Sequence, residues 1–320
     1  MNDITVDVHL SPDYLAETLR SDVLAGLLST PKTLPPKWFY DARGSELFVQ
    51  ITELPDYYPT RAEREILATY STEIAAVTGA NSLVELGSGS SEKTRLLLDA
   101  LHVRQFVPLD VSATALRESA TAIAAEYPDL AVHGVVGDFT EHLDLLPGDR
   151  PRLVAFLGGT IGNLVPGERA KFLASVRSVL FEGEWLLLGT DLVKDPSVLI
   201  RAYDDSTGVT ADFNRNVLRV LNRELDGNFD VDAFEHVAPW DAEAEWMEMR
   251  LRATRAMKVR LAALDLDVTF AAGEELHTEV SAKFTRPRVE AELAEAGFEL
   301  TRWLTDSEGR FAVSLARAAG

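Results

Sequence analysis

The sequence contains no cysteine among its 320 residues. Disulfide frameworks, thiolate nucleophiles and zinc or iron–sulfur sites held by cysteine are therefore excluded. Long apolar runs are also missing: stretches such as 185–188 fall far below the roughly 20 residues of a membrane helix, and residues 1–10 lack the basic start and apolar core of a signal peptide. We expect a soluble, cytoplasmic protein without a bound metal.

Basic residues are scarce, since 31 Lys and Arg stand against 51 Asp and Glu and give a formal charge of −20. An acidic surface repels phosphate backbones and anionic lipids unless a local basic patch compensates. The one modest basic cluster, 250–260, alternates with apolar residues as a strand does. We therefore expect no nucleic-acid or membrane partner, and a monomer that acts on a small molecule.

Repeated strand, turn and helix signals run through the first half of the chain. Helices are expected from Ser91/Glu92 to about 101, over 113–126, and with Pro166 near the start of a third. The expected strands are 83–86, 105–109, 131–136, 153–157 and 185–188. Five such units predict an α/β fold with a parallel, doubly wound sheet.

The C-terminal pattern adds a helix over 287–296 and a β-hairpin over 298–304 and 311–315. A terminal hairpin beside a parallel sheet is the layout of class I S-adenosylmethionine-dependent methyltransferases. We predict a cofactor-binding domain from 62–193 and 285–320, and a substrate-binding domain from 12–61 and 194–284. The second domain is expected to contain a helix with Tyr203, a helix over 211–225, and strands within 246–261, 264–270 and 277–284.

Glycine and carboxylate residues follow the first three expected strands. Gly87 opens a small-residue turn that lets the backbone approach a nucleotide-like ligand, although a plain turn also fits. Asp110 stands where a carboxylate accepts from ribose hydroxyls, or alternatively caps a helix. Asp138 and Phe139 offer an acceptor and an aromatic face to adenine, or merely form a turn. Together they predict a nucleoside site at the carboxyl edge of the sheet.

Two further polar residues lie in the predicted loops. Lys93 stands in the first turn of a helix, where the dipole disfavours a cation, so we expect a partner such as a ligand carboxylate; the alternative is a solvated lysine. Asn163 closes the glycine-rich loop after the fourth strand, where it orients a substrate or serves only the turn.

Tyr40, Tyr57 and Tyr203 lie in the predicted substrate domain, and their hydroxyls suit a small polar substrate if the rings do not simply pack. Glu279 and Ser281 are two residues apart and therefore share one face of a strand, which is either a binding face or a solvated one.

These segments resemble the histidine-specific Nα-methyltransferases of ergothioneine biosynthesis. The resemblance extends from about residue 15 to the end and rests on runs outside the generic cofactor motif. The matching runs are KWFYD (37–41), LPDYYPTR (54–61), ELGSG (85–89), FLG (156–158), IGNL (161–164), DD (204–205), FNRN (213–216) and TEVS (278–281).

The resemblance implies trimethylation of the α-amino nitrogen of L-histidine to hercynine, with S-adenosylmethionine as methyl donor. It implies cofactor contacts from Gly87, Lys93, Asp110, Asp138 and Phe139. Substrate contacts are implied for Tyr57, Asn163, Tyr203, Met249, Glu279 and Ser281, with Tyr40 and Asn163 beside the reacting amine. No nucleophilic side chain is needed, because the sulfonium carries the activation.

Three alternatives remain open at this point. A relative in the same family could methylate a tryptophan-type amine, which depends on whether Glu279 faces the substrate. A nicotinamide dehydrogenase could use a similar sheet, but the missing third glycine and the terminal hairpin disfavour it. A non-catalytic cofactor-binding protein would show no cofactor turnover.

Overall fold

The computed structural model describes residues 4–89, 91 and 93–320. The chain forms two compact units. Unit 1 consists of the residues up to Ser11, Pro59–Val193 and Phe284–Gly320, and unit 2 consists of Pro12–Tyr58 and Lys194–Lys283. The predicted domain boundaries, at 61/62, 193/194 and 284/285, lie close to these divisions. The described residues up to Ser11, which the prediction assigned to neither domain, belong to unit 1. The binding role predicted for each domain stays a prediction.

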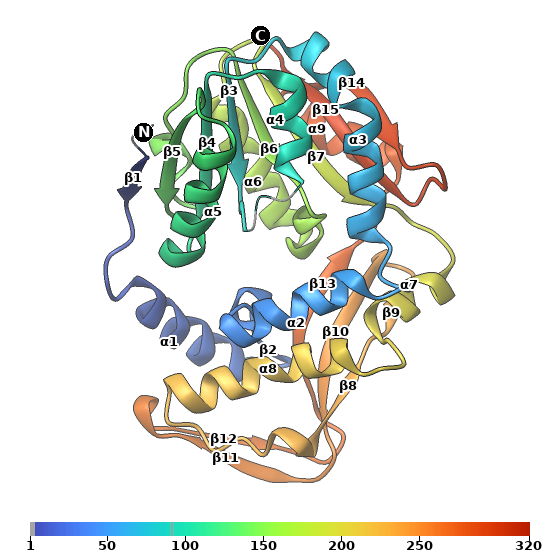
Figure 1. Ribbon diagram of the computed structural model, residues 1–320. Coiled ribbons are helices and arrows are strands. Elements are labelled where there is room, and N and C mark those ends of the chain that lie inside the picture. The colour runs from blue at the N-terminus through green and yellow to red at the C-terminus, as the bar shows by residue number, and fades with distance from the viewer. Residues whose placement is uncertain (1–3, 90, 92) are drawn as a thin grey trace. The chain divides into compact units, whose positions relative to one another are not determined.

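Unit 1 is built on one sheet of eight strands in the order β1-β5-β4-β3-β6-β7-β15-β14 (Figure 1). The strands are parallel except β15, which runs antiparallel to both β7 and β14. This confirms the predicted doubly wound sheet with a terminal hairpin. The bounds are β1 Thr5–Val8, β5 Ala131–Val136, β4 Gln105–Asp110, β3 Ser82–Leu86, β6 Arg152–Phe156, β7 Trp185–Asp191, β15 Phe311–Ala318 and β14 Phe298–Thr305.

Helices cover both faces of this sheet. Figure 1 shows α3, α4 and α5 in front of it and α6 and α9 behind it. Because both faces are covered, β3, β6 and β7 are buried along their whole length, as expected for central parallel strands. The helices are α3 Pro59–Thr78, α4 Thr94–Leu101, α5 Ala113–Glu126, α6 Pro166–Val179 and α9 Arg286–Glu295, with 3-10 turns at η2 Leu143–Leu145 and η3 Thr160–Asn163.

Unit 2 joins the two segments that flank the cofactor-domain sequence. Its main sheet has the order β2-β13-β10-β8, with β9 also pairing with β10, and β11 and β12 form a separate ribbon. The strands are β2 Lys32–Thr33, β8 Phe234–Val237, β9 Trp240–Asp241, β10 Trp246–Ala253, β11 Met257–Leu261, β12 Leu266–Phe270 and β13 Glu275–Ala282. The strand pattern predicted over 246–261 is thus two strands, because residues 254–256 turn the chain from one sheet to the other.

The helical part of unit 2 ties its two segments together. The helices are α1 Tyr14–Leu27, α2 Ala42–Glu53, α7 Pro196–Tyr203 and α8 Val209–Glu224, and the 3-10 turns are η1 Pro36–Phe39, η4 Val231–Ala233 and η5 Ala262–Leu264. The Asn216 amide of α8 donates to the Asp41 carboxylate at 2.7 Å and to the Phe39 carbonyl at 3.1 Å. The same Asp41 caps α2 by accepting from the Gly44 N–H. The two segments of unit 2 are therefore joined by hydrogen bonds at the N-terminus of α2.

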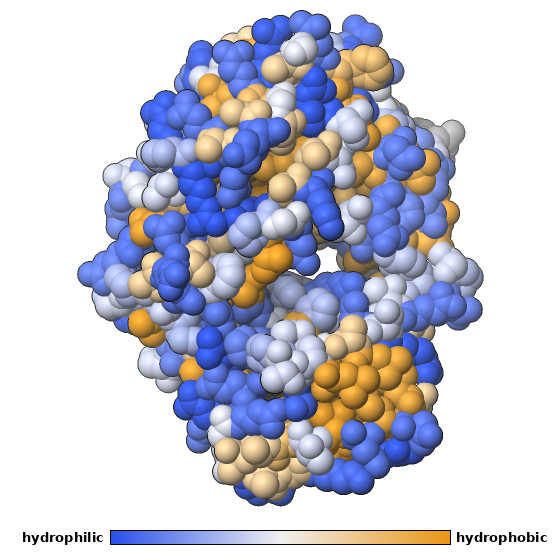
Figure 2. Space-filling view, turned by 180° about the vertical axis from the view of Figure 1, so that it is seen from behind, coloured by the Kyte–Doolittle hydropathy of each residue, from blue (hydrophilic) through white to orange (hydrophobic). Residues whose placement is uncertain are grey.

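The surface is mostly polar. Hydrophilic residues are spread over the face shown in Figure 2, interrupted by apolar areas, the largest of them in the lower part of the view. None of the helices in the described part of the chain is long and apolar enough to cross a membrane.

Candidate active site

The loop after β3 is shaped by two glycines in the left-handed region. Gly87 has φ 69° and Gly89 has φ 49°, while a Cβ at either position would meet nothing within 4 Å. Glycine is thus required by the backbone conformation and not by crowding. The Gly87 N–H donates to the Leu109 carbonyl at 2.9 Å, which fixes the loop against the end of β4.

Glu85, a buried residue of β3, holds the residues that follow this loop by hydrogen bonds. Its oxygens accept from the hydroxyls of Thr94 and Ser91. Burial is the largest influence and raises the pKa of Glu85 to about 7, against the two hydrogen bonds and the charge of Lys93, which lower it. The predicted helix start at Ser91/Glu92 is wrong: Ser91 has φ 50° and α4 begins at Thr94, while Glu92 lies outside the described residues.

Lys93 has a partner within the protein. Its ammonium donates to the carboxylate of Glu63, a fully buried residue of α3. Both Glu63 oxygens also accept from the Gly158 N–H, at 2.8 and 3.0 Å. Sequence reasoning missed Glu63, because nothing in a helical pattern marks which glutamate will be buried. The predicted contact between Lys93 and the cofactor stays a prediction.

Asp110, the last residue of β4, is held by backbone donors. One carboxylate oxygen accepts from the Gly89 N–H at 3.1 Å and the other accepts from the Ser112 N–H at 2.9 Å. Each carboxylate oxygen has a second lone pair, so the group can accept further hydrogen bonds in this position. The alternative of a helix cap is wrong, since the Ser112 hydroxyl caps α5.

Asp138 and Phe139 follow β5. One Asp138 oxygen accepts from the N–H and the hydroxyl of Thr140, at 2.8 and 2.6 Å, so this residue does form a turn. The half-buried Phe139 ring packs against Phe156 and Phe172, with centroid distances of 5.2 and 5.7 Å. The turn and the aromatic cluster hold both side chains beside the end of β5.

Asn163 ends the 3-10 turn η3, which follows β6 after Gly158 and Gly159. Both glycines have positive φ, at 80° and 71°. Since β5, β4, β3 and β6 are adjacent and parallel, their carboxyl ends lie along one edge of the sheet. Unit 1 thus gathers six predicted residues after these strand ends: Gly87, Lys93, Asp110, Asp138, Phe139 and Asn163.

Unit 2 gathers the other predicted residues. Tyr203, the last residue of α7, and Ser281 of β13 place their hydroxyl oxygens 2.7 Å apart. The ammonium of Lys283 donates to both oxygens at 2.8 Å and lies 4.6 Å from the Tyr203 ring centroid. Lys283 was missed by sequence reasoning, although the period of two that joins Glu279 and Ser281 continues to position 283.

The backbone of Tyr203 is also fixed. His236 contacts the Tyr203 carbonyl through Nε2 at 2.8 Å and the Asn214 amide through Nδ1 at 2.8 Å. Burial lowers the pKa of His236, so its neutral ring donates from Nε2 and accepts at Nδ1. Asn214 accepts in turn from the Thr278 hydroxyl at 2.7 Å, next to Glu279. This buried network ties α7, α8 and β13 together.

Glu279 and Met249 are direct cross-strand partners in β13 and β10. The register shifts immediately after this pair, between Met249 and Arg250. The Met249 side chain is buried and Glu279 is half-buried. The pairing makes Glu279 and Met249 neighbours, which their separation by 30 positions in the sequence does not predict.

Tyr40 lies within electrostatic range of Glu279, Tyr57 and Tyr203. Desolvation, and after it the carboxylate of Glu279 and the two other hydroxyls, raise the pKa of Tyr40 well above its ordinary value. Tyr40 keeps 47% of its surface exposed, so it remains in contact with water. The charge of the Glu279 carboxylate therefore disfavours the phenolate more than the loss of water does. Either cause leaves Tyr40 a neutral phenol at physiological pH.

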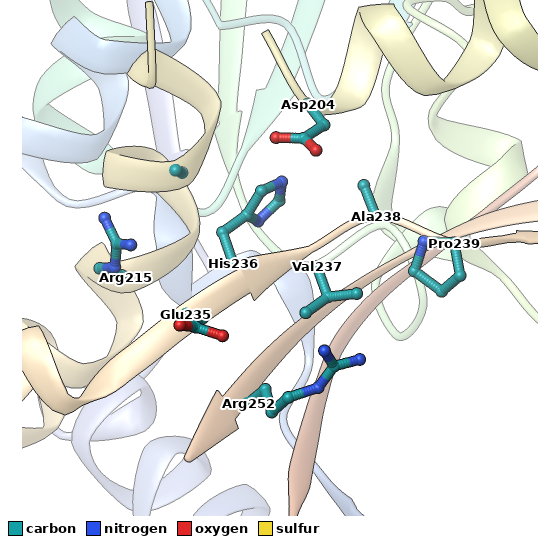
Figure 3. A pocket seen from close by; sticks show the side chains of 9 residues that line it. Asp204, Arg215, Glu235, His236, Val237, Ala238, Pro239 and Arg252 are labelled. Atoms are coloured by element: carbon teal, nitrogen blue, oxygen red, sulfur yellow. The ribbon is translucent and has the colours of Figure 1, made fainter. Parts of the chain in front are cut away.

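A separate pocket of about 510 Å³ opens in unit 2. Figure 3 shows Asp204 and His236 on one side of it and Val237, Pro239 and Arg252 on the other. None of the predicted site residues lines it, although its lining residue His236 contacts the Tyr203 carbonyl. Within the described part of the chain, no three His, Asp or Glu side chains are grouped so that they could hold a metal ion.

Comparison with known proteins decides the family. The sequence profile described as "Histidine-specific methyltransferase, SAM-dependent" matches residues 19–318. The chain belongs to this family. It is therefore a methyltransferase that uses S-adenosylmethionine, and the dehydrogenase and non-catalytic alternatives are excluded.

Two curated relatives share most of the sequence. The histidine N-alpha-methyltransferase of Mycolicibacterium smegmatis is 60% identical over 312 residues, which cover 96% of this chain and 97% of the relative. The histidine N-alpha-methyltransferase of Mycobacterium tuberculosis is 58% identical over 317 residues, covering 98% and 99%. The resemblance stated from the sequence motifs is confirmed.

A solved structure supports the fold alone. An S-adenosylmethionine-dependent methyltransferase from Clostridium acetobutylicum superposes with a TM-score of 0.50 at 12% identity, covering 86% of this chain and 99% of that one. This agrees with the class I methyltransferase fold of the family.

Proposed function

We propose that this methyltransferase transfers three methyl groups to the α-amino nitrogen of L-histidine and so produces hercynine, the first step of ergothioneine biosynthesis. Family membership and the two histidine-methylating relatives support this substrate. The observation that carries the proposal is that Glu279, Tyr57 and Tyr203 all act electrostatically on Tyr40, while Met249 is the cross-strand partner of Glu279.

In this proposal Glu279 accepts the imidazole N–H in a charge-assisted hydrogen bond. Tyr57 and Ser281 complete the contacts to the ring, and Met249 supplies the apolar wall. A polar group of this kind discriminates between substrates, because a substrate without the matching N–H cannot make the charge-assisted hydrogen bond. Tyr203 and Asn163 hold the amino and carboxylate end of the substrate.

The cofactor contacts are assigned to unit 1. Asp110 accepts from the ribose hydroxyls, Asp138 accepts from the adenine amine, and Phe139 presents a ring face to the base. The carboxylate positions and the glycine backbone of this edge fit a nucleoside with a charged amino-acid tail. Gly87 lets the backbone approach the ligand, and Lys93 provides a cation for its carboxylate.

S-adenosylmethionine supplies an activated methyl group when it is bound, so the side chains act by positioning and by removing water. The attacking amine must be uncharged, because an ammonium has no lone pair. Tyr40 cannot serve as a phenolate base, given its raised pKa. As a neutral phenol beside the amine, Tyr40 orients the nitrogen together with Asn163. Its oxygen accepts a hydrogen bond from one amine N–H.

We further propose that the protein acts as a cytoplasmic monomer on this small molecule, with no nucleic-acid or membrane partner. The formal charge of −20 supports this, since it disfavours polyanionic and anionic-lipid partners. Size-exclusion chromatography with light scattering tests the monomer, and cell fractionation tests the location.

The direct test is mass spectrometry of the purified protein with S-adenosylmethionine, an equimolar pool of the standard amino acids and tryptamine. We expect histidine alone to gain up to about 42 mass units, which is three methyl-for-hydrogen exchanges of about 14 each. Methylation of tryptophan or tryptamine instead would mean that Glu279 and Ser281 do not read an imidazole. If no amine in the pool is methylated, the proposal that L-histidine is the substrate is overturned.

A further inference from the structure

Lys283 is a buried cation that neither the family motifs nor the proposed function uses. It follows β13 directly, and none of its surface is exposed. Moving an ammonium out of water costs several kcal/mol unless polar groups compensate. Its ammonium donates to the hydroxyl oxygens of Tyr203 and Ser281, each at 2.8 Å.

The direction of these hydrogen bonds is fixed by chemistry. An ammonium can only donate, so both hydroxyl oxygens accept from Lys283. The two oxygens are themselves 2.7 Å apart, so one hydroxyl donates to the other. The hydrogen of the remaining hydroxyl must then be directed outside this triangle.

Such an arrangement also makes the outward hydroxyl a stronger donor. Hydrogen bonds in a chain polarise one another, and here the chain begins with a positive charge. The ammonium close to the Tyr203 ring adds positive potential at the same position. A carboxylate is the acceptor that gains most from a polarised donor beside a fixed cation.

We propose that Lys283 is a positioning residue that orders the two hydroxyls so that Ser281 donates to Tyr203 and Tyr203 donates to the carboxylate of an α-amino acid substrate. This rests on the proposed function, in which Tyr203 binds that end of the substrate. The cation acts on both the bound substrate and the transition state, since the carboxylate takes no part in methyl transfer. Its loss therefore affects KM and not kcat.

The test compares Lys283→Met with Tyr203→Phe and the double variant. We expect Lys283→Met to raise KM for histidine about 10- to 100-fold with kcat within about threefold, and to leave the Kd of S-adenosylmethionine unchanged. In the Tyr203→Phe background the same change should raise KM by no more than about threefold, because the hydroxyl that Lys283 orders is already absent.

A matched control is available in the same unit. Lys194 donates to the Tyr58 hydroxyl at 2.7 Å and lies 4.6 Å from that ring, but no substrate contact is assigned to Tyr58. Lys194→Met should leave KM for histidine within about threefold of the parent value. Equal effects of Lys283→Met in both tyrosine backgrounds, or an effect on kcat alone, would overturn the inference and show a structural role.

If Lys283→Met does not fold, Lys283→Gln replaces it in the test. Glutamine keeps a donating NH2 group but lacks the charge. Lys283→Gln should raise KM in the parent background but not with Tyr203→Phe. The proposed function fails separately: in that case the unmodified protein does not methylate histidine at all.

Discussion

The two units position their proposed ligand groups in different ways. In unit 1 the groups follow the carboxyl ends of adjacent parallel strands, so their order along the chain is enough to bring them together. In unit 2 they come from α7, β10, β13 and the segments before and after α2, and strand register and side-chain packing make them neighbours. A general cofactor site therefore needs little beyond the fold, whereas a substrate site depends on a specific assembly of distant segments.

Buried carboxyl groups show the same contrast. In unit 1, Glu85 accepts from the hydroxyls of Ser91 and Thr94, and burial raises its pKa to about 7. In unit 2, burial also opposes the ionisation of Asp205, but hydrogen bonds from Thr207, Thr210 and Val209 outweigh it and lower the pKa to about 2. Several of those donors are backbone N–H groups at the start of α8, so the charge is stabilised where the helix dipole favours it.

The largest expected effect comes from Glu279→Ala. Loss of the carboxylate removes a charge-assisted hydrogen bond to the imidazole, and kcat/KM for histidine should fall about 100-fold or more. The Kd of S-adenosylmethionine should stay within about twofold, because the contacts of that ligand are assigned to unit 1. Steady-state kinetics and calorimetry measure the two quantities. Glu235→Ala, an exposed change on β8, is the control and should alter neither.

The next effect concerns stability and pH. Between the ordinary pKa of Glu85, 4.5, and its folded value of about 7, the folded state holds a proton that the unfolded state has lost. Stability therefore falls as pH rises through this window. Glu85→Gln removes this penalty. The free energy of unfolding of the variant minus that of the parent should therefore be about 2 to 3 kcal/mol larger at pH 8 than at pH 5.

Urea denaturation at the two pH values measures this difference. Glu184→Gln is the matched control in unit 1, because hydrogen bonds from Arg152 and Phe181 outweigh the effect of burial and lower the pKa of Glu184. Its relative stability should not improve with rising pH. A parallel improvement in both variants would contradict the account of Glu85.

Asp205→Asn should show the opposite sign in unit 2. The folded pKa of about 2 lies below the ordinary value of 3.8, so ionised Asp205 stabilises the fold above about pH 4 and this contribution is lost as pH falls through about 2. The variant should lose about 2 kcal/mol at pH 7 and less at pH 3. Chemical denaturation measures both values, with exposed Asp204→Asn as the control that changes neither.

The smallest effect is expected from Asp110→Asn. Replacing the carboxylate by an amide keeps one acceptor and the shape of the side chain, so the Kd of S-adenosylmethionine should rise only about tenfold. The Kd of histidine should change less than about twofold. An equal loss for both ligands would mean that Asp110 supports the whole fold and not the cofactor site.

The sequence predicts unit 1 well where local signals suffice. Helix α5 has the predicted bounds 113–126, because Ser112 caps it and the Tyr127-Pro128 pair ends it. Strand β1 was missed, because it is a four-residue edge strand whose residues are half-buried or exposed and lack a clear alternation. The start of α4 was placed too early, because Ser91 has a left-handed backbone conformation, with φ 50°, that a right-handed helix does not include.

Unit 2 shows the limit of such reasoning. The helices that contain Tyr203 and Asn214 were predicted, as was the shared strand face of Glu279 and Ser281. The burial of Lys283 and the pairing of Met249 with Glu279 depend on contacts between segments far apart in the chain, which no local pattern contains. Only the resemblance to a family assigned a role to Met249.

The division of ligand binding between the units is tested most directly by calorimetric titration of S-adenosylmethionine and of L-histidine into the parent protein, Asp110→Asn and Glu279→Gln, each with the other ligand saturating. The account predicts a crossed result: Asp110→Asn weakens only the binding of S-adenosylmethionine, and Glu279→Gln weakens only that of histidine. Comparable losses of both affinities in either variant would contradict it.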